Sequence, residues 1–240
     1  MLPTAMTAAN APVFSADIDA VSADLIRKVA PYTMTSMERL YALRQAVIYL
    51  ARHRIAGDFV ECGVWRGGSM ALAAATLVEH VDTQRRLWLY DTFEGMSEPT
   101  GADVDLWGRD AKQLLQTPGQ QTELVHAISP IEQSQWVMRQ TNYPAERVVF
   151  VKGRVEESIP AHAPEVIALL RLDTDWYEST YHELVHLWPR LAIGGVLIVD
   201  DYGHWEGARR AVDQFVEERK LRILLNRIDY TGRMAVKLEA

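Results

Sequence analysis

The chain has 240 residues, a formal net charge of -7 and a sequence pI near 5.5. An acidic chain lacks the excess of basic side chains that nucleic-acid binders use to contact phosphates. It contains no run of the roughly 20 apolar residues that a membrane-spanning helix needs. Its composition is typical of one globular domain with a small appendage, and its single cysteine, Cys62, fits a reducing compartment. We therefore expect a cytoplasmic protein that binds neither nucleic acid nor a membrane.

The first quarter of the chain is predicted to be an arm followed by helices. Residues 1–13 are rich in Ala, Thr and Pro and read as a loose arm, with a dimer or lid contact as the alternative. Residues 17–29 and 35–53 carry apolar residues at helical spacing. We predict that the segment 1–56 covers a cofactor or a dimer partner, and that the protein is a homo-oligomer (a dimer or higher).

From residue 57 to residue 240 the pattern changes to strands and helices in alternation. Helices are predicted at 69–80, 177–188 and 205–218, and strands at 58–64, 87–90, 147–151, 167–172, 195–199, 222–226 and 234–238. Crossover helices between strands imply a mainly parallel sheet that is covered on both faces. The last two strands are separated by a turn and could form an antiparallel hairpin at one edge. The predicted fold class is therefore α/β.

Residues 92–121 do not fit this alternation. They contain several glycines and prolines, too many for one regular helix. Long insertions in compact domains are usually functional lids or disordered segments. Because this one directly follows the second strand, it is predicted to be a substrate lid over the ligand edge of the sheet.

Two predicted strands end in pairs of acidic residues. Asp173 and Asp175 follow one strand, and Asp200 and Asp201 follow the next. The carboxyl ends of parallel strands meet at one edge, which is where ligands bind in open α/β sheets. Carboxylates that converge there repel one another unless a cation or a proton holds them. The pattern therefore predicts a divalent metal site, and an all-oxygen ligand set suits Mg²⁺.

A glycine-rich turn joins the first strand to its helix. Gly63 lies in this turn, Ser69 lies at the start of the helix, and Asp91 closes the second strand. Glycines let the backbone approach a ligand, and an acid at this place can accept hydrogen bonds from ribose hydroxyls. The spacing predicts an adenosyl ligand without separating a nicotinamide cofactor from S-adenosylmethionine. A tight turn without any ligand would also favour glycine.

Three segments together resemble the macrocin O-methyltransferase family. They are FVECGVWRGG at 59–68, YDTFEGM at 90–96 and DDYGHWEGAR at 200–209. The resemblance runs from about Tyr32 to the C-terminus. It implies a Rossmann-like class I methyltransferase fold with a seven-stranded sheet, and S-adenosylmethionine- and Mg²⁺-dependent methylation of sugar hydroxyls in natural-product (antibiotic) biosynthesis. The implied partner is a glycosylated small molecule.

The resemblance also assigns residues to the methyl donor. Asp91 would hold the ribose, Ser69 would reach the carboxylate of the methionine portion, and Gly153 and Arg154 would lie near the adenine. The full set that it assigns to S-adenosylmethionine is Thr33, Met34, Glu61, Gly63, Ser69, Asp91, Gly153 and Arg154.

For the metal, the resemblance implies Asp173, Asp200 and Asp201 as ligands, which leaves coordination positions for two adjacent substrate hydroxyls. The alternative for these three aspartates is helix capping, or ion pairing with Arg171 or Arg209. Asp175 is the predicted general base. Its alternative role is to cap the helix that is predicted to begin near Tyr177.

The acceptor pocket is predicted to contain His204, Trp205, Phe93, Met96 and Trp107. His204 is also the second choice as base, because its pKa normally lies near the working range. Trp176 is assigned equally to a sugar-stacking wall and to ordinary packing. Two other functions stay open: a catechol-type O-methyltransferase that acts on an aromatic diol, and a non-catalytic protein that binds S-adenosylmethionine. A nicotinamide-dependent oxidoreductase is a distant alternative, because the dinucleotide-binding glycine spacing is absent.

Overall fold

The computed structural model describes residues 14–116 and 126–239. Its described part contains one seven-stranded sheet in the order β3-β2-β1-β4-β5-β7-β6. All pairs are parallel except those of β7 with β5 and with β6. The strands are β1 (Asp58–Cys62), β2 (Leu87–Asp91), β3 (Val148–Lys152), β4 (Ile167–Leu172), β5 (Leu191–Val199), β6 (Asn226–Arg227) and β7 (Arg233–Val236). This confirms the predicted α/β fold with a mainly parallel sheet and an antiparallel pair at one edge.

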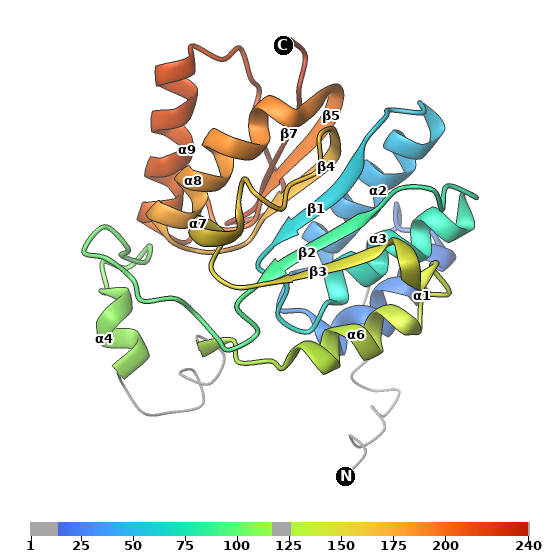
Figure 1. Cartoon of the computed structure of the whole chain (residues 1–240), viewed down its shortest axis with the longest axis horizontal. Coiled ribbons are helices and arrows are strands. Elements are labelled where there is room, and N and C mark those ends of the chain that lie inside the picture. The colour runs from blue at the N-terminus through green and yellow to red at the C-terminus, as the bar shows by residue number, and fades with distance from the viewer. Residues whose placement is uncertain (1–13, 117–125, 240) are drawn as a thin grey trace.

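Helices cover both faces of the sheet (Figure 1). One face carries α1 (Ala20–Val29), α2 (Met37–Arg52), α3 (Gly68–Glu79) and α6 (Ile131–Arg139). The other face carries α7 (Val155–Ser158), α8 (Tyr177–Leu187) and α9 (Glu206–Arg219). Short 3-10 turns stand at η2 (Ala30–Tyr32), η3 (Ala145–Arg147) and η4 (Trp188–Arg190). Among the described helices, none has the length and apolar character that spanning a bilayer requires.

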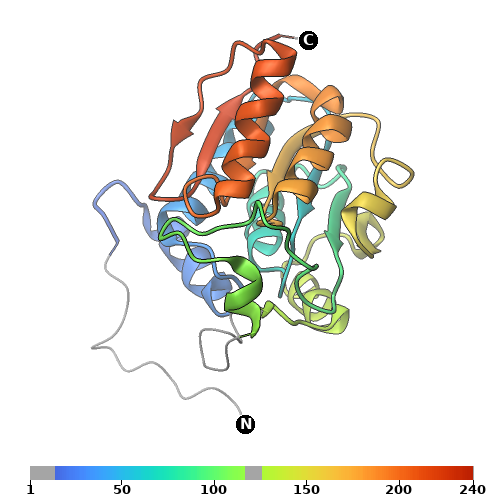
Figure 2. The ribbon, with the colours of Figure 1, turned by 90° about the vertical axis from the view of Figure 1, so that its left-hand side faces the viewer.

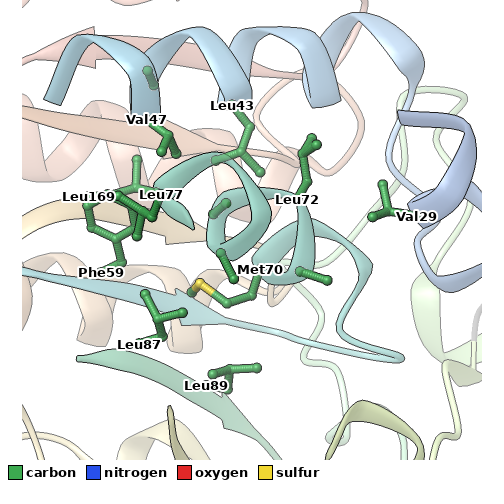
Figure 3. Packing of buried hydrophobic residues seen from close by; sticks show 14 of the residues in the cluster. Val29, Leu43, Val47, Phe59, Met70, Leu72, Leu77, Leu87, Leu89 and Leu169 are labelled. Atoms are coloured by element: carbon green, nitrogen blue, oxygen red, sulfur yellow. The ribbon is translucent and has the colours of Figure 1, made fainter. Parts of the chain in front are cut away.

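The hydrophobic core consists of one large cluster on each face of the sheet. Figure 3 shows the first of them, in which α2 and α3 lie against the strands and Val47 and Leu77 approach Phe59. Ile26 of α1 belongs to the same cluster. The N-terminal helices therefore share their core with the sheet. The second cluster joins β1, β4 and β5 to α8 and α9.

Most element boundaries fall close to their predicted positions, but the strand predicted at 222–226 is wrong: the structure has only the two-residue β6, Asn226–Arg227. β1 stops at Cys62 because the next residue, Gly63, has a φ of +83°, outside the strand region. β5 begins at Leu191, earlier than the predicted residue 195, because Leu191 already pairs with Ile167 of β4. The register then shifts past Gly194, whose φ is +81°, before Val196 pairs with Leu169. The helix Ile131–Arg139 was not among the predicted elements, although its spacing buries Val137 and Met138 on one side, in the core cluster that α3 shares.

The described portion of the predicted lid, residues 92–116, is an ordered loop that ends in the short helix α4 (Ala111–Gln116). Figures 1 and 2 show that it lies beyond the arrowhead ends of the strands, close to the starts of α8 and α9. Isolated bridges join Val104 to Asp110 and Asp105 to Trp205. Residues 117–121 of the predicted lid and the predicted arm at 1–13 lie outside the described residues.

Candidate active site

The two acidic strand ends lie side by side at the carboxyl edge of the sheet. β4 and β5 are parallel neighbours, and the N–H of Asp200 donates to the carbonyl of Leu172 at 2.9 Å. The N–H of Asp173 donates in the same way to Cys62, at the end of β1, at 2.8 Å. A cavity of about 470 Å³ opens over this edge. The predicted carboxylates all line it: Asp173, Asp175, Asp200 and Asp201.

Two arginines, the buried Arg171 and the partly buried Arg39, hold part of this acidic cluster. Nη2 of Arg171 lies 2.8 Å from Oδ2 of Asp173 and 2.9 Å from Oδ1 of Asp200. Arg39, on α2, pairs with the other oxygen of Asp200 and places its Nε 3.0 Å from Asp229. Burial alone would lower the pKa of Arg171, but the surrounding carboxylates outweigh it and raise that pKa. Both guanidinium groups therefore stay charged.

The two arginines nevertheless do not neutralise all the carboxylates of the acidic cluster. Burial, with a contribution from neighbouring carboxylates, raises the pKa of Asp173 and of Asp201 well above the usual range. Burial also raises the pKa of Asp175 to about 6, although hydrogen bonds from Asp201 and Trp205 act in the opposite direction. Groups of this kind take up a proton or a cation to relieve their repulsion.

The donor chemistry of the cluster fits a hard divalent cation. Oδ1 of Asp200 is buried and receives no hydrogen bond, because its approach to Arg171 lacks hydrogen-bond geometry. Neither arginine forms an ion pair with Asp201. Within residues 14–116 and 126–239, however, no three His, Cys, Asp or Glu side chains already stand in a metal-binding arrangement. Asp200 and Asp173 would have to turn away from their arginines to share an ion.

Asp175 does not cap the helix that follows it. Its backbone has a φ of +67°, and its N–H points to Oδ2 of Asp201 at 3.3 Å. The N-cap residue of α8 is Trp176, and its side chain makes no capping hydrogen bond. The N–H of Tyr177 is instead taken by Asp103, from the lid, at 2.8 Å. The carboxylate of Asp175 is left to face the cavity.

The same cavity reaches the glycine turn, where Asp91 organises the backbone. Oδ2 of Asp91 accepts hydrogen bonds from the N–H groups of Val64 and Trp65, at 2.7 and 2.9 Å. Its Oδ1 accepts from the N–H of Phe93 at 2.7 Å. Asp91 lines the cavity as predicted, but much of its accepting capacity is used within the protein.

The residues between the N-terminal helices close over the start of α3. Thr33 and Ser69 place their hydroxyl oxygens 3.2 Å apart, and Thr35 accepts a hydrogen bond from Arg171 at 2.8 Å. Thr33, Met34 and Ser69 all line the cavity, and the Met34 side chain is exposed. The predicted positions of this segment and of the helix start are thus brought together in one wall.

Two of the residues assigned to the methyl donor have mainly internal contacts. Glu61 is buried, does not line the cavity and pairs with Arg171 at 2.7 Å. Gly63 lines the cavity, but it is a glycine for a packing reason, because a Cβ at this position would overlap the carbonyl of Asp173. Gly153 and Arg154 line the far end of the cavity, and the N–H of Gly153 donates to the carbonyl of Asp91 at 3.0 Å.

The predicted acceptor residues divide into two groups. His204, Trp205 and Met96 line the cavity near the acidic cluster, and burial lowers the pKa of His204. Phe93 does not line it: the side chain is buried in the core and packs against Phe150, with ring centroids 6.2 Å apart.

Trp107 does not line the cavity either, but it lies beside it. Its exposed ring meets the ring of His204 edge-on, with centroids 5.7 Å apart. Trp176 lines the cavity, and its ring also packs against Trp205 at 4.9 Å, while its Nε1 donates to the carbonyl of Ser97 at 3.0 Å. Both of the roles weighed for Trp176 are therefore compatible with its position.

The sequence interpretation missed several cavity residues, foremost Arg39, Thr35 and Tyr230. Arg171 was foreseen as an ion-pair partner of the aspartates, and it pairs with Asp173 and Asp200. A charged residue inside the apolar run IALLRL has to be paired with opposite charge when it is buried. Arg39 and Tyr230 reach the cavity from a helix face and a turn whose spatial position the sequence does not reveal.

The fold and the site together define a class I O-methyltransferase. The chain belongs to the macrocin O-methyltransferase family, whose model matches residues 3–236. The solved O-methyltransferase NovP superposes with a TM-score of 0.74 at 29% identity, over 87% of this chain and 83% of that one. A calicheamicin methyltransferase at 18% identity shares the fold with a TM-score of 0.64, over 97% of both chains.

Curated relatives are similar over most of the chain. The 8-demethyl-8-(2,3-dimethoxy-alpha-L-rhamnosyl)-tetracenomycin-C 4'-O-methyltransferase of Streptomyces olivaceus is 36% identical, over 84% of this chain and 74% of its own. The demethyldecarbamoylnovobiocin O-methyltransferase of Streptomyces niveus is 33% identical over 77% of this chain and 67% of its own. The mycinamicin III 3''-O-methyltransferase of Micromonospora griseorubida is 29% identical over 84% of this chain and 76% of its own. The chain is an O-methyltransferase, as the motifs predicted.

Proposed function

We propose that the protein methylates a hydroxyl on the sugar of a glycosylated small molecule, with S-adenosylmethionine as methyl donor and Mg²⁺ at the acidic cluster. One observation carries this proposal: a single cavity joins the glycine turn and Asp91 at one end to Asp175 and Asp201 at the other. A donor held at the first end and an acceptor held at the second would share one enclosed volume. The family supports the same conclusion, because relatives act on a rhamnosyl tetracenomycin and on mycinamicin III.

The proposed roles of the residues follow from their positions in the cavity. Thr33, Met34, Ser69, Asp91, Gly153 and Arg154 would hold the donor, which supplies an electrophilic methyl group on a sulfonium sulfur. Glu61 and Gly63 would act on the donor indirectly, by fixing the backbone on which it rests. Glu61 would do so through its ion pair with Arg171, and Gly63 by allowing the turn to pack against the carbonyl of Asp173.

At the other end Asp173, Asp200 and Asp201 would hold Mg²⁺, which lowers the pKa of a hydroxyl that it coordinates. Asp175 accepts the proton of the acceptor hydroxyl, so that the oxygen can act as a nucleophile. Burial raises the pKa of Asp175 above the usual aspartate range, which makes its carboxylate a stronger base than an exposed one. His204, Trp205 and Met96 orient the sugar, and Trp107 contacts the part of the acceptor that extends out of the cavity.

The test is an acceptor panel with purified protein, S-adenosylmethionine and Mg²⁺. The rhamnosyl tetracenomycin, mycinamicin III and demethyldecarbamoylnovobiocin serve as acceptors beside simple catechols, and mass spectrometry locates the added methyl group. Methylation of a sugar hydroxyl in any glycoside supports the proposal. Turnover of the catechols alone would reassign the site to an aromatic diol. Donor binding by calorimetry without turnover of any acceptor would show that the protein methylates neither these glycosides nor the catechols.

A further inference from the structure

The lid contains a buried carboxylate that touches neither the cavity nor its predicted ligands. Asp103 is fully buried. Its Oδ1 accepts the N–H of Tyr177, the first residue of α8, at 2.8 Å. Its Oδ2 accepts the N–H and the hydroxyl of Thr100, at 2.7 and 2.9 Å. A lid residue thus caps a helix that begins 74 positions further along the chain.

The start of α9 meets the same carboxylate. A Cβ at Gly207, in the first turn of α9, would overlap Oδ1 of Asp103 and would lie 3.1 Å from the N–H nitrogen of Tyr177. The preceding residue, Glu206, donates its N–H to the carbonyl of Val104 at 2.8 Å. The starts of α8 and α9 and the lid therefore meet at one point, and glycine is required there for close approach rather than for its backbone freedom.

These two helix starts directly follow the two acidic strand ends. Asp173 and Asp175 lead into α8, and Asp200 and Asp201 lead into α9. Trp176 and Trp205, which immediately precede the helices, pack against each other and against Ala111 of the lid helix. Any shift of one helix start relative to the other must change the separation of Asp175 from Asp201.

We propose that Asp103 is a positioning residue for methyl transfer: it clamps the starts of α8 and α9 together and so sets the relative position of Asp175 and Asp201. The clamp rests on the proposed function only in so far as those two aspartates are the base and a metal ligand. The clamp also gives the lid a role besides covering the cavity. When the lid is not docked, the N–H groups of Tyr177 and Glu206 lose their hydrogen-bond partners, the carboxylate of Asp103 and the carbonyl of Val104.

The first test uses hydrogen–deuterium exchange and does not depend on activity. In Asp103→Ala, amide exchange should rise in peptides that cover residues 174–180 and 203–209. The matched control is Asp19→Ala, which removes the side-chain cap of α1 on the opposite face of the sheet. Unchanged exchange at both helix starts in Asp103→Ala would overturn the clamp, whatever the enzyme methylates.

The second test is a double-mutant cycle with the best acceptor of the panel. Gly207→Ala usually favours a helix, but here its methyl group should displace Asp103 and lower kcat by roughly 10- to 100-fold, as a misplacement near 1 Å does. Asp103→Ala should lower kcat to a similar extent, with the dissociation constant of S-adenosylhomocysteine unchanged. In the Asp103→Ala background, Gly207→Ala should add little further loss.

The outcomes separate the two proposals. Losses that multiply in the double variant, or a wild-type kcat in Asp103→Ala, would overturn the positioning role. A purely structural role would lower the melting temperature without a selective fall in kcat for the folded protein. If the wild type methylates no member of the panel, the proposed function fails, while the exchange experiment still decides the clamp.

Discussion

Arg171 and Glu61 stand opposite each other in the parallel pair of β4 and β1, and their side chains form a buried ion pair of 2.7 Å. The other nitrogen of the same guanidinium reaches Asp173 and Asp200. One arginine therefore connects the strand that carries the glycine turn to the acidic cluster. The two halves of the proposed site share an electrostatic support within the sheet as well as a cavity above it.

Removal of this arginine should be costly. Arg171→Met leaves the buried Glu61 without its cation and removes one of the two guanidinium partners of Asp200, and the loss of one partner of a buried pair typically costs about 3–5 kcal/mol. The control is Lys112→Met, which breaks an exposed ion pair with Glu98 and should change the free energy of unfolding little, because water screens the pair. Urea denaturation measures both free energies of unfolding. Equal losses in the two variants would contradict a structural role for the buried pair.

Glu61 should make the stability of the protein depend on pH. Burial raises the pKa of Glu61 from 4.5 to about 7, and the opposing effect of Arg171 does not offset it. Below pH 4.5 the carboxyl is protonated in both states, and its contribution to stability is fully present. Between pH 4.5 and pH 7 the carboxyl of Glu61 stays protonated in the folded state and ionises in the unfolded state. Its contribution to stability is therefore lost as the pH rises through 7.

Glu61→Gln, which stays neutral, should remove this dependence. Relative to the variant, the wild type should lose roughly 3 kcal/mol of unfolding free energy between pH 4 and pH 8. Denaturant titrations at several pH values measure the difference. Parallel stability profiles for the two proteins would show that Glu61 does not titrate in this range.

Asp175→Asn tests the general base. The variant should lower kcat by about 10²- to 10⁴-fold, because an amide accepts no proton from the acceptor hydroxyl. Affinity for S-adenosylhomocysteine and the melting temperature should stay close to those of the wild type, since Asp175 caps no helix. A large fall in melting temperature would instead indicate a structural role, and wild-type turnover would exclude Asp175 as the base.

Asp201→Asn tests the metal site. Asp201 is the predicted ligand that neither Arg39 nor Arg171 holds, so its loss should weaken Mg²⁺ binding without releasing an arginine. Calorimetry with Mg²⁺ alone measures the binding, and EDTA should abolish turnover of the wild type until Mg²⁺ is restored. Full activity in excess EDTA would refute the metal role.

Asp91 should affect donor binding in two ways. It supports the turn through the N–H groups of Val64 and Trp65, and it is proposed to hold the ribose. Asp91→Ala should therefore weaken the binding of S-adenosylhomocysteine. A 2'-deoxy analogue separates the two contributions: if Asp91 contacts the 2'-hydroxyl, the substitution should weaken the analogue less than the parent compound. Equal weakening of both ligands would leave only the support of the turn.

The order of elements and the approximate position of the acidic cluster could be predicted from the sequence. Alternating strands and helices have few compatible arrangements, and acids that follow buried parallel strands must meet at one edge of the sheet. Ile167–Leu172 was predicted at its observed bounds because a short apolar run of this kind reads clearly. The family motifs then indicated the chemistry that this edge supports.

Other parts of the site depend on contacts between distant segments. Phe93 was predicted to meet the acceptor, yet the turn after β2 directs its ring into the core. Arg39 pairs with Asp200, which lies 161 positions away in the sequence. The cap of α8 is Asp103 and not Asp175, the residue that the sequence offered for this role. Local sequence patterns specify helices, strands and their ends, because those depend on near neighbours. Which charge neutralises a buried carboxylate is decided only when the tertiary structure brings remote side chains together.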